Sequence, residues 1–501
     1  MLRAIYHPAR VLLPGLLIAL TLVQACGSDS NGSGYTAPDP QFALTLGDAS
    51  ISLSQGSAAS TSVKVTRSGG LTSPITYTLS GAPAGLTVNV VPTSVSDSST
   101  LAVTASAALA AGTYQITVNA SAPGAPAQQK SITVTVSAVA GGTPLIRSVV
   151  AGAHTCALTT ASVAYCWGYN DYGQLGNGDT SIVNPTPIKV AGGLLFAALF
   201  VSKVEGVTCG VTPPGVAYCW GNNGDGELGD GTRAQHKTPT PVTGGLTFRS
   251  FAVGTFHTCG VVMDGTAYCW GFSNAGAFGD GTTGSRPTPT VAAPGMKFDN
   301  IVAGQDFTCG LTLEGGAAYC WGRGMDGELG NGAASNSATP VPVSGGLTFQ
   351  SLAAGGLSVC GLTTGGKAYC WGDDFFGTLG DGSSATDDGV TRRVAPVEVA
   401  GGLTFKSLSA GYRTVCGVAA SGAGYCWGYN NGAVGDGTLD PRSRPTPIAG
   451  GLTFQSIGVG TGQTCGVTTT SALYCWGTNG NGELGDGTTE PRSSPGPVRW
   501  P

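Results

Sequence analysis

Alternating apolar and polar residues predict β-strands along most of this chain. Between Phe42 and Val136 the alternation runs through seven short segments, among them FALTL, TSVKVTR, TYQITVNAS and KSITVTVS. Period-two alternation at this spacing, with turn residues between the segments, predicts a small β-sandwich over residues 40–137. Residues 142–501 also read as short strands, and no stretch there sustains the apolar period of a helix.

A repeated unit fills this second region. Tyr-Cys-Trp-Gly occurs seven times, first in Ala164–Gly168 and then at steps of 49 to 56 residues. In the unit that starts at Gly244, strands are predicted from Leu246, over His257–Val262 and over 266–270. The Thr-Pro-rich end of the unit predicts a fourth strand at an edge, where proline is tolerated. Seven such units predict a seven-bladed β-propeller.

Each unit carries two cysteines, ten or eleven residues apart. Placing Cys259 opposite Cys269 in an antiparallel hairpin leaves the loop Met263–Gly265, and a loop of this length favours glycine at its end. Five units have glycine there, whereas the first and last have Ser162 and Ser471. The register predicts one disulfide per hairpin, with a zinc site or free buried thiols as the alternatives. The predicted pairs are Cys156–Cys166, Cys209–Cys219, Cys259–Cys269, Cys309–Cys320, Cys360–Cys370, Cys416–Cys426 and Cys465–Cys475.

The same alternation sorts the side chains of the repeated strand. In AYCWG the tyrosine and tryptophan share one face, and the alanine and cysteine share the other. Both faces of a propeller blade pack on neighbouring blades, so the tyrosines, tryptophans and cystines are predicted to form the core between blades.

Composition and charge narrow the class of protein. The 501 residues include 83 glycines, only 10% are charged, and the net charge is −5. This is a turn-rich, weakly charged chain that lacks the basic footprint of a nucleic-acid-binding protein. We therefore predict no nucleic-acid partner.

The first 26 residues predict export. Arg3 and Arg10 flank the start of an apolar run of thirteen residues, which is too short to span a bilayer as a helix. The run ends in VQAC, which resembles a bacterial lipobox, and this resemblance implies acylation of Cys26. Fifteen cysteines also equal seven pairs plus Cys26. Residues 27–39 predict a flexible linker. The expected location is the bacterial envelope, at the outer membrane or cell surface; an uncleaved anchor is the alternative.

Two stretches resemble known families. PAGLTV from Pro83 and AAGTYQITVNA from Ala110 resemble bacterial immunoglobulin-like domains. Val149–Asp179, VVAGAHTCALTTASVAYCWGYNDYGQLGNGD, resembles the regulator of chromosome condensation repeat, and all seven units match in outline. That family implies a seven-bladed propeller. The second unit departs most, because VSKVEGVTC lacks the usual Ala-Gly step, and the family histidine is kept only at His154 and His257.

Candidate chemistry is sparse. G-x-G-x-x-G occurs at 224–229 and 480–485, but a dinucleotide site needs a βαβ unit that is not predicted. DGELGDG has too few acidic ligands for an EF-hand loop, so a turn is favoured over calcium. No Ser/His/Asp order, HExxH or carboxylate pair stands out. We predict no cofactor, no metal and no catalytic residues.

A variable position after each Trp-Gly predicts a partner-binding face if the units superpose. The fifth unit has the longest excursion there, and long loops on a rigid scaffold often carry function. The candidate face comprises Tyr169, Tyr172, Phe272, Asp373, Asp374, Phe375, Phe376 and Tyr429. The prediction is a monomeric, non-enzymatic lipoprotein that binds an extracytoplasmic protein or glycan. Alternatives are an enzyme acting on polysaccharide and an inhibitor of a secreted enzyme.

Overall fold

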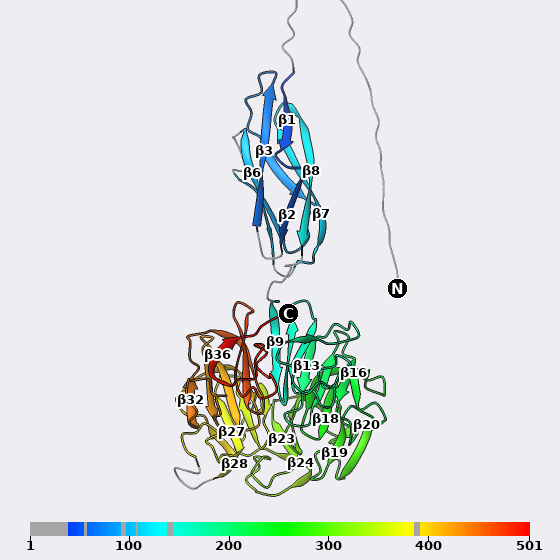
Figure 1. Cartoon of the computed structure of the whole chain (residues 1–501), viewed down its shortest axis with the longest axis vertical. Coiled ribbons are helices and arrows are strands. Elements are labelled where there is room, and N and C mark those ends of the chain that lie inside the picture. The colour runs from blue at the N-terminus through cyan, green and yellow to red at the C-terminus, as the bar shows by residue number, and fades with distance from the viewer. Residues whose placement is uncertain (1–38, 55–57, 92–96, 107–108, 138–143, 385–390) are drawn as a thin grey trace, which may run out of the picture. The chain divides into compact units, whose positions relative to one another are not determined.

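The computed structural model describes residues 39–54, 58–91, 97–106, 109–137, 144–384 and 391–501. The chain divides into two compact units, and the boundary lies at the end of β8. Every regular element among the described residues is a strand (Figure 1). None of them forms a helix long and apolar enough to cross a bilayer. The predicted all-β class is confirmed, whereas Cys26 and its lipobox lie outside the described residues.

The first unit has two four-stranded antiparallel sheets, in the orders β1-β3-β6-β5 and β2-β8-β7-β4. Their alternating residues bury Val63, Leu101, Ile116 and Val134 completely. β2, a short strand rich in serine, was not predicted from the alternating pattern. The likeness to immunoglobulin domains stays a prediction from sequence. The strands are β1 Gln41–Leu46, β2 Ser50–Ser54, β3 Ala58–Ser68, β4 Thr76–Ser80, β5 Leu86–Val91, β6 Ser98–Ala105, β7 Gly112–Ala122 and β8 Ala125–Ser137.

The second unit has seven four-stranded sheets, each built from one continuous segment of chain and here called blades 1 to 7. Blade 1 comprises β9 Ile146–Ala151, β10 His154–Thr159, β11 Ala164–Gly168 and β12 Ile188–Lys189. Blade 2 comprises β13 Ala198–Val201, β14 Val207–Val211, β15 Ala217–Gly221 and β16 His236–Pro241. Blade 3 comprises β17 Phe248–Val253, β18 His257–Val262, β19 Ala267–Ser273 and β20 Gly284–Ala292. Blade 4 comprises β21 Phe298–Ala303, β22 Phe307–Thr312, β23 Ala318–Gly322 and β24 Ser337–Pro342. Blade 5 comprises β25 Ser351–Ala354, β26 Ser358–Leu362, β27 Ala368–Asp373 and β28 Arg392–Glu398. Blade 6 comprises β29 Phe405–Ala410, β30 Thr414–Ala419, β31 Gly424–Gly428 and β32 Arg442–Pro447. Blade 7 comprises β33 Phe454–Val459, β34 Gln463–Thr468, β35 Leu473–Gly477 and β36 Arg492–Pro497.

The blades form a closed ring. The first strand of each blade lies beside the first strand of the next, and β33 of blade 7 returns to β9 of blade 1. Figure 1 shows the blades following one another in chain order, from β9 in cyan to β36 in red. This arrangement confirms the predicted seven-bladed propeller.

The central hairpin of each blade has the register inferred from its cysteines. Cys259 lies opposite Cys269, with 4.1 Å between their Cα atoms and a disulfide between them, and the other six blades repeat this. Gly265 ends its loop with a φ of 86°. Ser162 and Ser471 adopt the same left-handed region, with φ of 64° and 63°. The two serine units therefore keep the loop geometry at a conformational cost that glycine avoids.

A tryptophan joins each blade to the one before it. Trp270 is fully buried, and its Nε1 donates to the carbonyl oxygen of Glu227 at 2.8 Å. Gly229 lies against the ring, where a Cβ would come within 2.6 Å of Nε1. The G-x-x-G motif is therefore a turn that receives the tryptophan of the next blade. The remaining indole donations are Trp167 to Glu483, Trp220 to Gln174, Trp321 to Ala277, Trp371 to Glu328, Trp427 to Thr378 and Trp476 to Ala433.

The ring closes through the same contact that joins its other blades. No strand is exchanged between blades 7 and 1. Instead, Trp167 of blade 1 donates to Glu483 O of blade 7 at 2.8 Å, and Trp500 packs edge-on against Trp167 and Tyr165. The tryptophans and cystines form the predicted core, but the tyrosines of the repeat are only half-buried. They stand nearer the hairpin end of the blade, where the neighbouring blade covers them in part.

Candidate functional site

One face of the ring carries the variable loops that follow Trp-Gly. In blades 2 to 7 the residue after Trp-Gly lies beside the residue just before the second strand of the same blade, at the end opposite the central hairpin. This surface, formed by the loops between first and second strands and those after third strands, is called the loop face. The backbone N–H donations that define it are Asn222 to Gly206, Phe272 to Phe256, Arg323 to Asp306, Asp373 to Leu357, Tyr429 to Arg413 and Thr478 to Gly462.

Aromatic residues from blades 5 and 6 meet on the loop face. Phe375 is 45% exposed and lies edge-on to Phe376, with ring centroids 4.8 Å apart. Phe376 in turn packs on Tyr429 of the next blade at 4.7 Å, and Tyr429 is 36% exposed. The Arg413 guanidinium lies 5.2 Å from the Phe376 centroid. Phe375, Phe376, Tyr429 and Arg413 are called the aromatic cluster.

Other candidate aromatic residues lie elsewhere on the loop face. Tyr169 and Tyr172 of blade 1 are half-buried, with centroids 6.4 Å apart. Phe272 of blade 3 pairs with Phe256 at the same distance. The face therefore presents three aromatic groups on different blades. Among the described residues of this face, the aromatic cluster alone combines two exposed rings, Phe375 and Tyr429, with a cation.

The two acidic candidates of blade 5 are not surface residues. Asp373 is 9% exposed, and its carboxylate lies 3.9 Å from Arg413 Nε. Asp374 is fully buried, and its Oδ1 accepts the backbone N–H of Leu379 at 3.0 Å. The assignment of Asp374 to the binding face is wrong, because its side chain turns inward to hold the Gly-x-Leu-Gly turn. Asp373 lies on the loop face but offers a partner little exposed surface.

In four other blades an asparagine stands at the position of Asp374, and its Oδ1 accepts the same backbone N–H of the turn. Asn223 Oδ1 accepts the N–H of Leu228 at 3.0 Å, and its Nδ2 donates to the carbonyl oxygens of Thr232 and Ala234. The carboxylate of Asp374 offers no donor, and its Oδ2 is buried with no partner among the described atoms. Burial raises the pKa of Asp374 to about 7. Alignment of the seven units on Trp-Gly could have shown this inward position before the structure was known.

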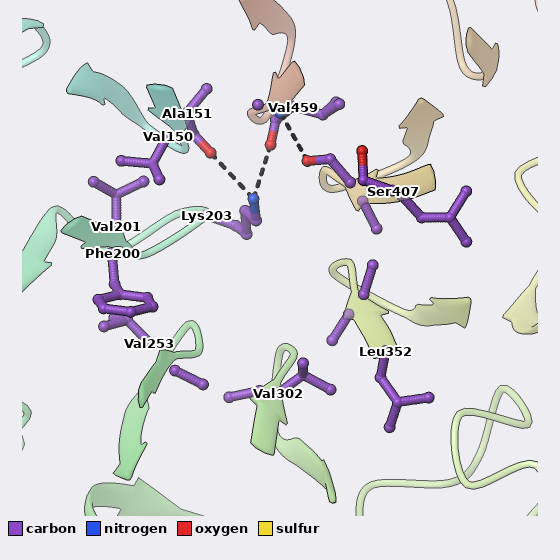
Figure 2. A pocket seen from close by; sticks show the side chains of 18 of the residues that line it. Val150, Ala151, Phe200, Val201, Lys203, Val253, Val302, Leu352, Ser407 and Val459 are labelled. Carbon is purple, nitrogen blue, oxygen red and sulfur yellow. Dashed lines mark hydrogen bonds between the residues drawn. The ribbon is translucent and has the colours of Figure 1, made fainter. Parts of the chain in front are cut away.

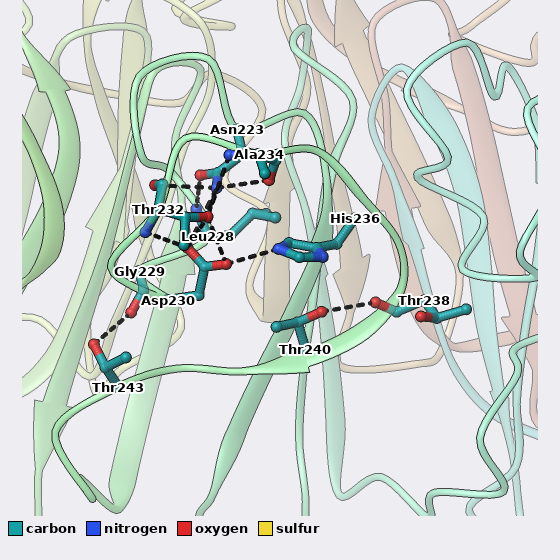
Figure 3. A network of polar contacts seen from close by, with 10 residues as sticks. All are labelled: Asn223, Leu228, Gly229, Asp230, Thr232, Ala234, His236, Thr238, Thr240 and Thr243. Atoms are coloured by element: carbon teal, nitrogen blue, oxygen red, sulfur yellow. Dashed lines mark hydrogen bonds and ion pairs between the residues drawn. The ribbon is translucent and has the colours of Figure 1, made fainter.

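The Asp-Gly-Thr turns use their carboxylates within the protein. Figure 3 shows the network in blade 2, where Asp230 accepts from the hydroxyl of Thr232 at 2.9 Å and lies 2.8 Å from His236 Nε2. In blades 3, 5, 6 and 7 an arginine of the fourth strand replaces the histidine. No group of three or more His, Cys, Asp or Glu side chains suited to a metal occurs in the described part of the chain. The turn role of this motif follows from these bonds.

The two family histidines are structural. His154 Nε2 lies 2.6 Å from Thr208 Oγ1, which donates to Gln174 O, so the histidine donates and its Nδ1 is unprotonated. His257 repeats this contact with Thr308 at 2.8 Å. Burial lowers the pKa of His154 to about 3 and that of His257 to about 4. Both imidazoles are thus neutral, fully buried bridges between blades, directly beneath the loop face.

The fold is a seven-bladed propeller with variable loops on one face. Models of the Regulator of chromosome condensation (RCC1) repeat match residues 163–212, 214–261, 264–311 and 315–362, and also 146–174 and 349–378. The ring therefore contains RCC1 repeats.

Sequence relatives match short stretches. The Ultraviolet-B receptor UVR8 of Arabidopsis thaliana is 32% identical over 124 residues, which are 23% of this chain and 26% of UVR8. The human E3 ubiquitin-protein ligase HERC2 is 34% identical over 105 residues, 20% of this chain. The chain spans only 2% of the length of HERC2. Because proteins named as receptor and as ligase share the repeat, it does not by itself assign an enzymatic activity.

Solved structures share the fold. Prp20p from Saccharomyces cerevisiae has a TM-score of 0.59 at 21% identity and covers 67% of this chain and 85% of its own. Human WBSCR16 has a TM-score of 0.60 at 19% identity, covering 68% and 95%. Likeness at these identities is one of fold. An RCC1-type propeller suggests a protein-interaction or regulatory role.

Proposed function

We propose that the propeller is a non-enzymatic binding module that takes a protein partner through its loop face. The aromatic cluster carries this proposal. Phe375 and Tyr429 expose 45% and 36% of their surface beside the Arg413 cation. Tyrosine and arginine are enriched among residues that dominate binding energy, and exposed aromatic surface gains most when a partner covers it. Inhibition of a secreted enzyme is one form that such binding would take.

Replacing Phe375 with alanine tests the face. Once a pull-down of envelope proteins has supplied a partner, Phe375→Ala should weaken its binding by about 1–2 kcal/mol. Titration calorimetry gives the affinity, and the melting temperature should change little because Phe375 lies at the surface, with 45% of it exposed. Met263→Ala is the matched control: this side chain is 69% exposed but lies in the hairpin loop at the opposite end of blade 3.

Two results would move the site. Equal loss of affinity in both variants would mean a nonspecific hydrophobic effect, and unchanged affinity in Phe375→Ala would place the binding surface elsewhere. A glycan array run with the same protein covers the other partner class predicted from the sequence. A hydrolase panel with polysaccharide substrates covers the enzymatic alternative.

We further propose that the protein is held at the bacterial envelope by a lipid on Cys26. The apolar run and VQAC support this anchor. Cys26→Ala should abolish labelling by a lipid precursor and release the protein from the membrane fraction. The processed wild-type protein is the control for expression. A variant that loses the label yet stays in the membrane would show that the apolar run itself is an uncleaved anchor.

A further inference from the structure

The axis of the propeller contains a mostly apolar cavity. The first strands of all seven blades enclose about 460 Å³, which we call the axial cavity. Figure 2 shows Val201, Val253, Val302 and Leu352 around it. Pockets for small molecules are of this size, roughly 300–1,000 Å³, and combine apolar walls with a few polar groups.

Lys203 supplies the one charged side chain of the cavity wall. It follows β13 in VSKVEGVTC, the segment that departs most from the repeat. Its Nζ donates to Ala151 O at 3.1 Å and to Val459 O at 2.8 Å (Figure 2). These carbonyl groups end β9 and β33, so the ammonium lies at that end of the axial cavity and touches blades 1 and 7.

The ammonium has unused binding capacity. It carries three N–H donors, and the two carbonyl oxygens take two of them. No carboxylate in the described ranges forms an ion pair with it. Burial lowers the pKa of Lys203 to about 8, so the amine is mostly protonated near neutral pH. A cation beside apolar walls with no counter-ion is costly unless an anion joins it.

The opposite end of the cavity is polar but neutral. Asn300 and Ser456 line it from early positions of β21 and β33. Asn300 Oδ1 and Ser456 Oγ are buried with no hydrogen-bond partner in the described structure. The positive charge of the cavity wall therefore lies at the Lys203 end alone, so the two ends of the cavity differ and an amphiphilic ligand would bind in one orientation.

We propose that the axial cavity binds an aliphatic monocarboxylate. Its carboxylate accepts the third N–H of Lys203, and its chain passes Val201, Val253 and Val302 at the lysine end and extends toward Asn300 and Ser456. A neutral amphiphile would leave the charge of Lys203 uncompensated, and a dicarboxylate would place its second charge at the neutral end, where no cation lines the cavity. Lys203 lies in one loop of the loop face, but the lining of the axial cavity includes no residue of the aromatic cluster, so the two proposals use different residues.

Lys203 also has a structural role, because its two hydrogen bonds join blade 2 to blades 1 and 7. Replacement by methionine therefore affects ring stability as well as charge. Ligand binding is therefore measured in the wild-type chain as well, and one variant changes the cavity while keeping Lys203.

Decanoate labelled with ¹³C at its carboxyl carbon is the probe, titrated below its micelle concentration into the full chain. We expect a saturable carboxyl shift with the wild-type protein and binding at least about tenfold weaker for decanol, which lacks the charge. Val302→Phe narrows the cavity and keeps Lys203, and it should reduce binding to a similar extent. Lys203→Met should do the same, with its melting temperature recorded to confirm folding.

Three outcomes would overturn the proposal. They are absence of saturable decanoate binding to the wild-type chain, equal affinity for decanol and decanoate, and full affinity retained by Val302→Phe. If Lys203→Met does not fold, the other two comparisons still decide. The Phe375→Ala variant should bind decanoate normally, which separates this site from the aromatic cluster.

Discussion

Replacing Trp270 with alanine should cost the propeller about 3–5 kcal/mol of unfolding free energy. The indole is fully buried between blades 2 and 3 and contacts Phe248 and Phe251. Alanine leaves a cavity there and removes the hydrogen bond to Glu227 O. Chemical denaturation under oxidising conditions measures the loss. A cost below about 1 kcal/mol, the level of many surface changes, would contradict the role given to this contact.

Two phenylalanine variants separate the hydrogen bond from the packing. Glu227 O also accepts Thr258 Oγ1 at 2.9 Å, so Trp270→Phe leaves that carbonyl partnered. In blade 5 the threonine is replaced by Val359, and Trp371 is the one side chain in the described structure that donates to Glu328 O. Trp371→Phe should therefore cost at least about 1 kcal/mol more than Trp270→Phe, the penalty of a buried unpaired carbonyl. Equal costs would mean that packing alone matters.

Replacing Asp374 with asparagine should stabilise the protein above neutral pH. The pKa of this carboxyl is raised from its ordinary 3.8 to about 7 in the folded state because it is buried. Its contribution to stability is therefore present at low pH and is lost as the pH rises from about 4 to about 7, because the unfolded chain ionises first. The difference corresponds to about 4 kcal/mol. Asparagine removes the ionisation and adds a donor that four other blades use.

Denaturation curves at about pH 4 and pH 8 measure this effect as the difference between wild type and Asp374→Asn. Subtraction cancels His154 and His257, whose lowered pKa values make stability fall as the pH drops below their unfolded values. Asn430→Asp is the matched control, since it introduces a carboxyl at the same position of blade 6 and should create the opposite dependence. Parallel stability curves for wild type and Asp374→Asn would show that Asp374 is solvated.

Local pattern predicts the blade and much of its interior. The cysteine spacing and the glycine at Gly265 define the central hairpin, because a short loop has few conformations and the strands alternate faces. The serines at 162 and 471 do not break this register, since they adopt the same φ as glycine. The burial of the tryptophans also follows from alternation, because both faces of a blade are covered.

Contacts between side chains of different blades are harder to predict from the sequence pattern. The cluster of Phe376 with Tyr429 joins residues 53 positions apart, and the sequence indicates only that each lies in a loop. Asp374 looks like an exposed acid beside exposed aromatics, yet its backbone position turns it under the loop. Solvent exposure of a loop residue depends on which neighbour packs over it.

The sequence by itself determined the strand pattern, the seven-fold repeat, the cystine pairing and the tryptophan core of this protein. These features depend on the spacing of residues close in sequence and on covalent geometry, both of which follow directly from the sequence. Only the tertiary structure decided that Lys203 reaches the carbonyl groups of Ala151 and Val459 at the axis. VSKVEGVTC showed a departure from the repeat, but its partners are 52 and 256 residues away, and only closure of the ring brings them within hydrogen-bonding distance.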